Sequence, residues 1–244
     1  MYVATAAPFD IVTLFDCDNT LLDHDRVVAD LRNHLEREFG PRNRDRYFEI
    51  FEDLRKELGY ADYLGALQRY RLGANNDPRL LKMSCFLVDY PFADRVYPGS
   101  LEVIEHFGKL GPTVILSDGD VVFQPRKIQR SGLWDAVGGR VLIYIHKESM
   151  LDDVEQRYPA RHYIMVDDKL RILAEMKKVW GIKLKQKRKG KQKTMTGYAL
   201  EKNDKIEEFA RKGDFINWLH WKHDYRVRKR EVEVERQMKK LKLS

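Results

Sequence analysis

The sequence predicts a doubly wound α/β fold, in which a parallel sheet carries helices on both faces. Four short apolar runs are rich in β-branched residues and lack polar alternation, as strands buried on both faces of a parallel sheet do. Helical segments separate the last three runs. Each run ends abruptly in polar residues, which places four polar clusters at the carboxyl edge of the sheet, where such folds bind ligands.

The predicted elements follow one another in a regular order. The strand candidates are Ile11–Phe15 (IVTLF), Thr113–Leu116 (TVIL), Val141–Ile145 (VLIYI) and Tyr163–Val166 (YIMV). The polar residues that follow these runs read DCDNT, SDGD, HKE and DDK. The helical segments are Leu101–Leu110 before the second run, Pro125–Ser131 between the second and third runs, and Lys147–Arg157 between the third and fourth.

The long segment between the first two strand candidates is predicted to form a helical cap. From about Asp25 to Tyr97 apolar residues recur at helical spacing. Asp23 and Asp25 are expected to cap its first helix. Three glycines are placed as helix stops, at Gly40, Gly59 and Gly73. We therefore expect a core formed by residues 1–24 and 96–200, a cap at 25–95 and a charged C-terminal extension at 201–244.

Positive charge is concentrated in the last quarter of the chain. Residues 1–180 hold 25 Lys and Arg against 29 Asp and Glu, a balance of −4, whereas residues 181–244 hold 20 against 9, a balance of +11. The segment 183–193 carries seven basic residues in eleven, a density that can bind phosphate backbones or anionic surfaces. Aromatic residues are scarce within it, which disfavours single-stranded nucleic acid, so we interpret it as a solvated extension.

Composition favours a cytoplasmic protein. No run approaches the roughly 20 apolar residues that a membrane-spanning helix needs. The first ten residues, MYVATAAPFD, lack the basic start and apolar block of a secretory signal. The two cysteines, Cys17 and Cys85, cannot form a disulfide framework, as expected in a reducing compartment.

Two carboxylates follow the first strand candidate. Asp16 and Asp18 stand two residues apart, and like charges so close repel each other unless a cation or a shared proton intervenes. Mg²⁺ prefers oxygen ligands, relieves such repulsion and assists reactions of phosphate esters. One carboxylate can attack phosphorus and form an aspartyl-phosphate, while the other protonates the leaving alcohol and then activates water.

The other strand ends offer the remaining parts of such a site. The hydroxyl of Ser117 and the backbone amides of Asp118 and Gly119 can hold phosphoryl oxygens. The ammonium group of Lys147 can offset charge on the attacked phosphoryl group. The pair Asp167–Asp168 can complete the acidic ligands of the metal.

In this order, the four motifs resemble those of the haloacid dehalogenase superfamily of phosphohydrolases, from about Phe9 to Gly181. DCDNT at 16–20, SDG at 117–119, the lysine of HKE and DD at 167–168 carry the resemblance. The chain is similar in particular to the phosphoglycolate phosphatase and β-phosphoglucomutase branch. The resemblance implies a Rossmann-like three-layer α/β/α core with a helical cap inserted between the first and second motifs.

The resemblance also implies a role for each matching residue. Asp16 would be the nucleophile and a metal ligand, and Asp18 the general acid and base, with its backbone carbonyl on the metal. Thr20 would support the turn. Ser117 and Lys147 would hold the phosphoryl group, and Asp168, assisted by Asp167, would complete the magnesium shell. Asp18 also argues against the dehalogenase branch, which lacks this carboxylate because cleaving a carbon–halogen bond needs no acid.

We therefore expect a magnesium-dependent phosphatase of a small phosphomonoester, such as a sugar phosphate, phosphoglycolate or a nucleoside monophosphate. A phosphomutase of the same chemistry is one alternative, and a non-catalytic protein whose basic tail contacts nucleic acid is another. The expected partner is a small phosphorylated metabolite, and no membrane association is expected. The expected oligomeric state is a monomer or a homodimer.

Overall fold

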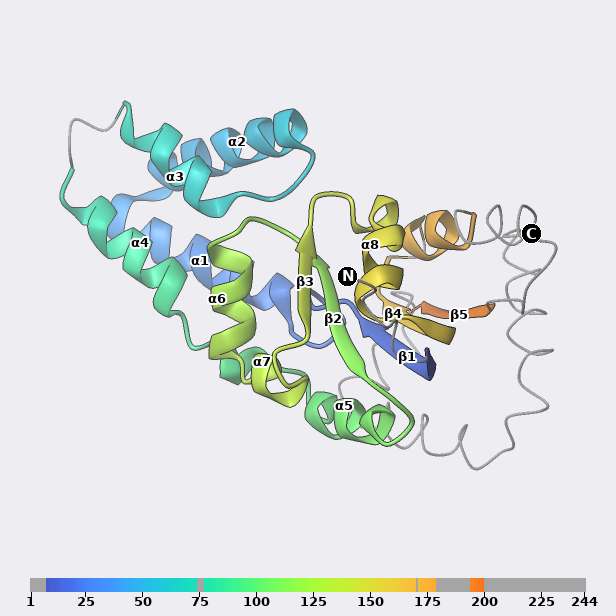
Figure 1. The fold of residues 1–244 in the computed structure, drawn as a ribbon. Coiled ribbons are helices and arrows are strands. Elements are labelled where there is room, and N and C mark those ends of the chain that lie inside the picture. The colour runs from blue at the N-terminus through green and yellow to red at the C-terminus, as the bar shows by residue number, and fades with distance from the viewer. Residues whose placement is uncertain (1–7, 74–76, 170, 179–193, 200–244) are drawn as a thin grey trace, which may run out of the picture. The chain divides into compact units, whose positions relative to one another are not determined.

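The structure is a computed structural model that describes residues 8–73, 77–169, 171–178 and 194–199 (Figure 1). Its strands are β1 (Phe9–Phe15), β2 (Thr113–Asp118), β3 (Val141–Tyr144), β4 (Ala160–Asp167) and β5 (Thr194–Ala199). The strand order is β3-β2-β1-β4-β5. The pairings of β1 with β4, β2 with β3 and β4 with β5 are parallel, which confirms the predicted α/β fold and its four strand candidates.

Helices fill the connections between the strands. They are α1 (His24–Phe39), α2 (Pro41–Leu58), α3 (Tyr63–Arg71), α4 (Arg79–Asp89), η1 (Phe92–Arg95), α5 (Ser100–Gly108), α6 (Phe123–Arg130), α7 (Leu133–Ala136), η2 (Lys147–Ser149) and α8 (Leu151–Arg157). A further helix covers 171–178. The prediction of a single helix over Lys147–Arg157 is wrong at its start, because a 3-10 turn, η2, precedes the α-helix α8 there. The Lys147 amide donates to the Asp118 carboxylate at 2.7 Å, so a side chain from β2 holds this end of the segment.

The described residues fall into two compact units, and the first takes its residues from Met1–Asp16, Tyr97–Val114 and Glu148–Ser244. Within it, β4 pairs with β1 on one side and with β5 on the other. Leu14 and Phe15 of β1 are fully buried. The Phe15 ring meets Phe107 of α5 edge to face, with ring centroids 5.8 Å apart. Because successive side chains of a strand point to opposite faces, both faces of β1 are covered, as expected for an inner strand of a parallel sheet.

The second unit comprises Cys17–Val96 and Ile115–Lys147. Figure 1 shows the helices α1 to α4 of this unit grouped together, and α6 packs against α4. Asp23 is the N-cap of α1 and accepts from the Arg26 amide at 3.0 Å, as predicted for it. Gly40 ends α1 at φ +83° and Gly59 ends α2 at φ +80°, backbone angles that favour glycine.

The partition into a core and a cap stays a prediction. The basic segment 183–193 and the predicted extension at 201–244 lie outside the described residues. No helix in the described ranges combines the length and the hydropathy needed to cross a bilayer.

Candidate active site

Parallel pairing brings the carboxyl ends of β1 and β4 side by side. Phe15 lies opposite Val166 in the register, and the Asp16 amide donates to the Val166 carbonyl at 2.9 Å. Asp167 is the last residue of β4, and Asp168 follows it. Because neighbouring parallel strands end at the same edge, the acids that follow the two strands gather there.

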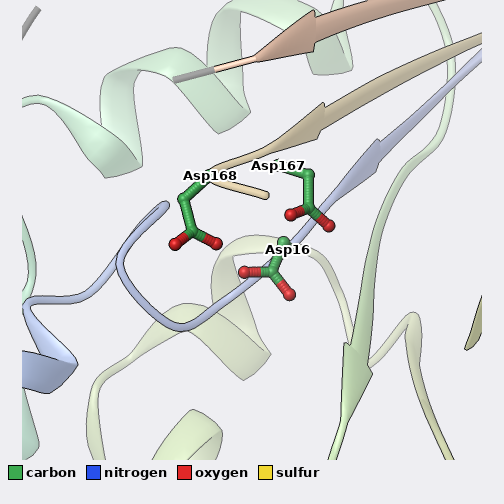
Figure 2. A group of neighbouring side chains, drawn as sticks. All are labelled: Asp16, Asp167 and Asp168. Atoms are coloured by element: carbon green, nitrogen blue, oxygen red, sulfur yellow. The ribbon is translucent and has the colours of Figure 1, made fainter. Parts of the chain in front are cut away.

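Asp16, Asp167 and Asp168 form a group that we call the acidic cluster. Each residue offers one carboxylate oxygen, and these oxygens all lie within 4.8 Å of one another, as the converging side chains in Figure 2 show. Asp16 is 2% exposed and Asp167 is 0% exposed, so little water screens their charges. At 4.8 Å and an effective dielectric constant near 20, two negative charges repel by about 3.5 kcal/mol.

The acidic cluster fits a divalent cation. A bound cation converts the mutual repulsion of the carboxylates into attraction. Carboxylate oxygens are the ligands that Mg²⁺ prefers, and one or two of them with water molecules and phosphate oxygens usually complete its shell. Three carboxylates at one sheet edge therefore have the right chemistry for Mg²⁺.

The chain turns sharply after β1. The Cys17 carbonyl accepts from the amides of Thr20 and Leu22 at 3.3 and 3.1 Å, and Asn19 adopts φ +60°, a conformation that asparagine tolerates. Thr20, which we expected to support this turn, is 5% exposed. The turn presents Asp18, whose carboxylate enters a second group of polar contacts.

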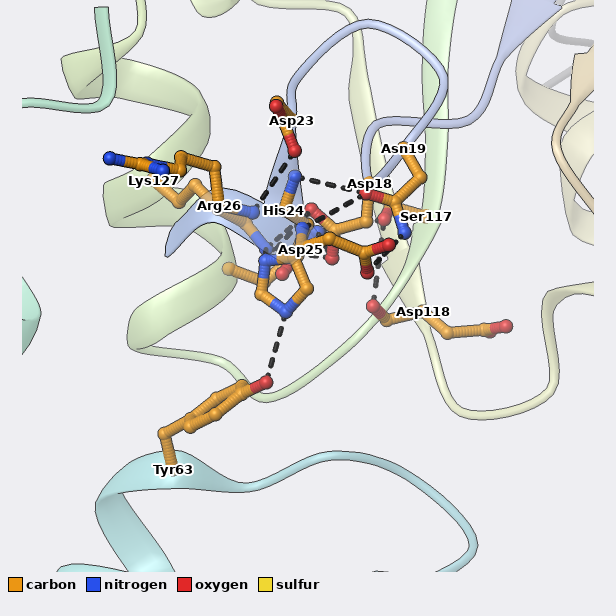
Figure 3. A network of polar contacts seen from close by, with 11 residues as sticks. Asp18, Asn19, Asp23, His24, Asp25, Arg26, Tyr63, Ser117, Asp118 and Lys127 are labelled. Atoms are coloured by element: carbon orange, nitrogen blue, oxygen red, sulfur yellow. Dashed lines mark hydrogen bonds and ion pairs between the residues drawn. The ribbon is translucent and has the colours of Figure 1, made fainter. Parts of the chain in front are cut away.

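This second group, the Asp18 network, consists of Asp18, His24, Tyr63, Ser117, Gln124 and Lys127. Figure 3 labels all of these residues except Gln124. The Lys127 ammonium lies 2.5 Å from Asp18 Oδ1 and 2.7 Å from Oδ2. Gln124 Nε2 donates to Ser117 Oγ at 2.8 Å and lies 3.4 Å from Asp18 Oδ2. One amide thus ties the end of β2 to the carboxylate that follows β1.

His24 and Tyr63 extend the network into the helices. His24 Nδ1 lies 3.8 Å from Asp18 Oδ1, and its Nε2 lies 3.0 Å from the Tyr63 hydroxyl. Burial raises the pKa of Tyr63, and the negative charge of Asp18 raises it further, so the hydroxyl stays protonated at neutral pH. The Tyr63 hydroxyl can therefore donate to His24, which connects α3 to the Asp18 carboxylate.

Sequence reasoning missed Gln124 and Lys127. Both stand on the buried face of α6 with Phe123 and Ile128, and they are 3% and 1% exposed. Positions 123, 124, 127 and 128 lie on one side of a helix, so the spacing was the available signal. Gly119 makes room for this face, because a Cβ there would come within 2.8 Å of the Gln124 side chain.

The remaining predicted residues occupy the ends of β2 and β3. Lys147 is 1% exposed, and its Nζ donates to the Leu116 carbonyl at 3.2 Å. Asp118 uses its carboxylate to accept from the Lys147 amide at 2.7 Å. The Gly119 amide donates to the Tyr144 carbonyl at 3.1 Å, which corrects the expectation that this amide is a free donor for phosphoryl oxygens. The Gly119 amide is thus used in a backbone hydrogen bond at the end of β2 and β3.

Comparison with known proteins identifies the family. The profile of the haloacid dehalogenase-like hydrolases matches residues 12–179. The chain is 69% identical to a haloacid dehalogenase-like hydrolase from Burkholderia xenovorans LB400, with a TM-score of 0.70 over 78% of this chain and 83% of that one.

Two more distant structures match with lower scores. The hydrolase YfnB from Bacillus subtilis, solved with magnesium, is 16% identical at a TM-score of 0.46 and covers 67% of this chain and 80% of its own. The L-2-haloacid dehalogenase from Xanthobacter autotrophicus, solved with chloropropionic acid covalently bound, is 18% identical at a TM-score of 0.45. The match covers 68% of this chain and 73% of the dehalogenase. No curated protein matches. On the family profile, the chain belongs to the haloacid dehalogenase-like hydrolases.

Proposed function

We propose that this hydrolase removes phosphate from a small phosphomonoester with the help of Mg²⁺, using Asp16 as nucleophile and Asp18 as general acid and base. The observation that carries the proposal is the acidic cluster, whose three carboxylate oxygens lie within 4.8 Å of one another. Such a set of charges is costly unless a cation is present. Mg²⁺, when bound there, supplies positive charge that favours attack on a phosphoryl group.

In the first half of the reaction an Asp16 oxygen attacks phosphorus, and the bond between phosphorus and the alcohol oxygen breaks. The alcohol takes a proton from Asp18 as it leaves. Only Cys17 separates the two acids, so their Cα atoms lie at most about 7.6 Å apart. In the second half water gives its proton to Asp18 and attacks phosphorus, which releases inorganic phosphate and restores the Asp16 carboxylate.

The other predicted residues support this cycle. Ser117 and Lys147 hold the phosphoryl group, and the ammonium of Lys147 offsets its charge. Asp16, Asp167 and Asp168 would hold the metal, and the Asp18 backbone carbonyl would be a further ligand. Thr20 maintains the turn that presents Asp18. The proposed substrate is a small phosphorylated metabolite.

Asp18 favours a phosphatase over a dehalogenase. An alcohol is a poor leaving group without a proton, whereas halide leaves as an anion and needs none. A carboxylate at position 18 therefore has a use in phosphate ester hydrolysis that it lacks in dehalogenation.

The test is a substrate panel assayed with magnesium and with chelator. We expect at least one phosphomonoester to be hydrolysed to inorganic phosphate, with activity lost in chelator and almost abolished in Asp16→Asn. Asp10→Asn serves as control, since Asp10 lies on the same strand but is solvent-exposed beside Arg161. Hydrolysis run in H₂¹⁸O should place the label in the released phosphate. Turnover of 2-haloacids alone, or full activity in Asp16→Asn, would contradict the proposal, and an isomeric sugar phosphate as product would identify a mutase.

A further inference from the structure

We propose that Lys127 is a positioning residue that fixes the Asp18 carboxylate for proton transfer. The inference rests on the proposed function, because it assigns Asp18 the role of acid and base. The motifs in the sequence do not include Lys127, which lies on α6, 109 residues from Asp18 along the chain. The geometry of their contact is what brings it into the site.

Lys127 holds both oxygens of the carboxylate. Its Nζ lies 2.5 Å from Asp18 Oδ1 and 2.7 Å from Oδ2. Two short contacts to one ammonium fix the direction of the carboxylate as well as its distance. The Lys127 side chain is 1% exposed, against 21% for Asp18, so water cannot readily replace the contact on the lysine side.

Neighbouring groups restrict Lys127 itself. Its ammonium lies 5.3 Å from the centroid of the Phe123 ring, within the range of a cation–π interaction, and 3.5 Å from His24 Nδ1. Gln124 Nε2 lies 3.4 Å from the same Asp18 oxygen that Lys127 contacts at 2.7 Å. The carboxylate is thus held from two positions on one helix.

Orientation of this kind matters for proton transfer. A general acid must come within about 2.6–3.2 Å of the atom that receives its proton. A displacement of about 1 Å can lower a rate about 100-fold. A carboxylate without Lys127 could rotate among its side-chain conformers, and only some of them would direct a proton to the leaving oxygen.

Residues other than Lys127 also attach α6 to the fold. Arg126 donates to the Val88 carbonyl at 3.1 Å and pairs with Asp89 at 3.2 Å, and Arg130 donates to the Asp89 carbonyl at 3.0 Å. Ile128 is fully buried on the same helix. Other residues of α6 therefore also attach the helix, and a loss confined to one class of substrate would not be expected from a purely structural role of Lys127.

The test compares two substrates that differ in their need for an acid. p-Nitrophenyl phosphate releases an acidic phenol that needs little protonation, whereas an alkyl phosphate releases a basic alkoxide. In Lys127→Met we expect kcat/KM to fall about 100-fold for the alkyl phosphate and less than about 10-fold for p-nitrophenyl phosphate. The ratio of the two values is measured on one preparation, so a partly misfolded sample does not change it.

Further variants make the outcome decisive. Lys127→Gln, whose side chain is shorter and uncharged, should show the same selective loss and replaces the methionine variant if that variant does not fold. Arg126→Met, on the same helix, should leave the ratio unchanged. Equal losses with both substrates, or an unchanged ratio, in the Lys127 variants would overturn the inference.

Asp18→Asn separates this inference from the proposed function. If Asp18→Asn shows the selective loss and the Lys127 variants do not, the positioning role fails while the proposed acid stands. If kcat/KM of Asp18→Asn, which reports the steps up to release of the alcohol, falls equally with both substrates, Asp18 is not the acid, and both the proposed role and the inference from it fail.

Discussion

Asp167→Asn tests the acidic cluster by thermal stability, without any assay of turnover. The substitution keeps the shape of the side chain, and its amide oxygen can still accept from the Lys169 amide, as the Asp167 carboxylate does at 2.7 Å. It removes one negative charge from a set of oxygens that lie within 4.8 Å of one another. At 4.8 Å and an effective dielectric constant near 20, a pair of such charges repels by about 3.5 kcal/mol, and relaxation of the site or uptake of protons lowers the net effect.

Two results should follow in thermal unfolding. In chelator, Asp167→Asn should be at least as stable as the parent protein, because a buried repulsion has been removed. With Mg²⁺ at about 100 times its Kd, the parent should gain about 2.7 kcal/mol. If the lost ligand weakens binding 100-fold, the variant gains only about 0.4 kcal/mol at the same concentration. For a chain of this size, 1 kcal/mol corresponds to about 2–4 °C in Tm.

Asp10→Asn is the matched control, since it removes the same charge from β1 at an exposed position that pairs with Arg161. A surface pair of this kind is worth at most about 1 kcal/mol, so the control should keep the full magnesium gain. The reasoning would be refuted if Asp167→Asn kept that gain, or if its chelated form were less stable than the chelated parent by more than about 1 kcal/mol.

Three further substitutions test the fold. Leu14→Ala, at a fully buried position of β1, should cost about 2–5 kcal/mol in urea denaturation, and a loss below 1 kcal/mol would contradict the assigned packing. Gly59→Ala should cost about 1–2 kcal/mol in the same assay, because Gly59 has φ +80° and its added Cβ would lie 3.0 Å from His146 Nε2. Burial lowers the pKa of His34 below 6.5, so its contribution to stability is present above that pH and is lost as pH falls through the folded-state value. His34→Phe should keep the stack with Phe86 and weaken the pH dependence of unfolding as pH falls below 6.5, whereas an unchanged dependence would exclude His34 as its source.

The acidic cluster could be predicted from the sequence because local and global signals agree at its residues. Asp16 and the pair Asp167–Asp168 each follow an apolar run directly, and runs of that kind are inner strands of a parallel sheet. Once β1 and β4 are neighbours, strand geometry alone brings their carboxyl ends together. No side-chain detail was needed for that step.

The Asp18 network could not be predicted in the same way. Gln124 and Lys127 lie on a short polar helix, where lysine and glutamine face water in most proteins. Their burial depends on how α6 packs against α4 and η1, which are distant in sequence. The same limit applies to Lys147, where the contact of its amide with Asp118 replaces the predicted first helical turn by η2.

Stability alone does not account for the pair of Lys127 and Asp18. Burying an ammonium group to 1% exposure costs several kcal/mol, and attraction to a carboxylate offsets that cost only when the geometry is good. A methionine at position 127 would pack beside Phe123 and Ile128 without this cost. The acidic cluster has the same property, because apolar or amide side chains would be cheaper at the end of β1 and β4. Two groups of charges that both oppose stability are expected where a reaction needs them, and the proposed transfer of a phosphoryl group and a proton would use both.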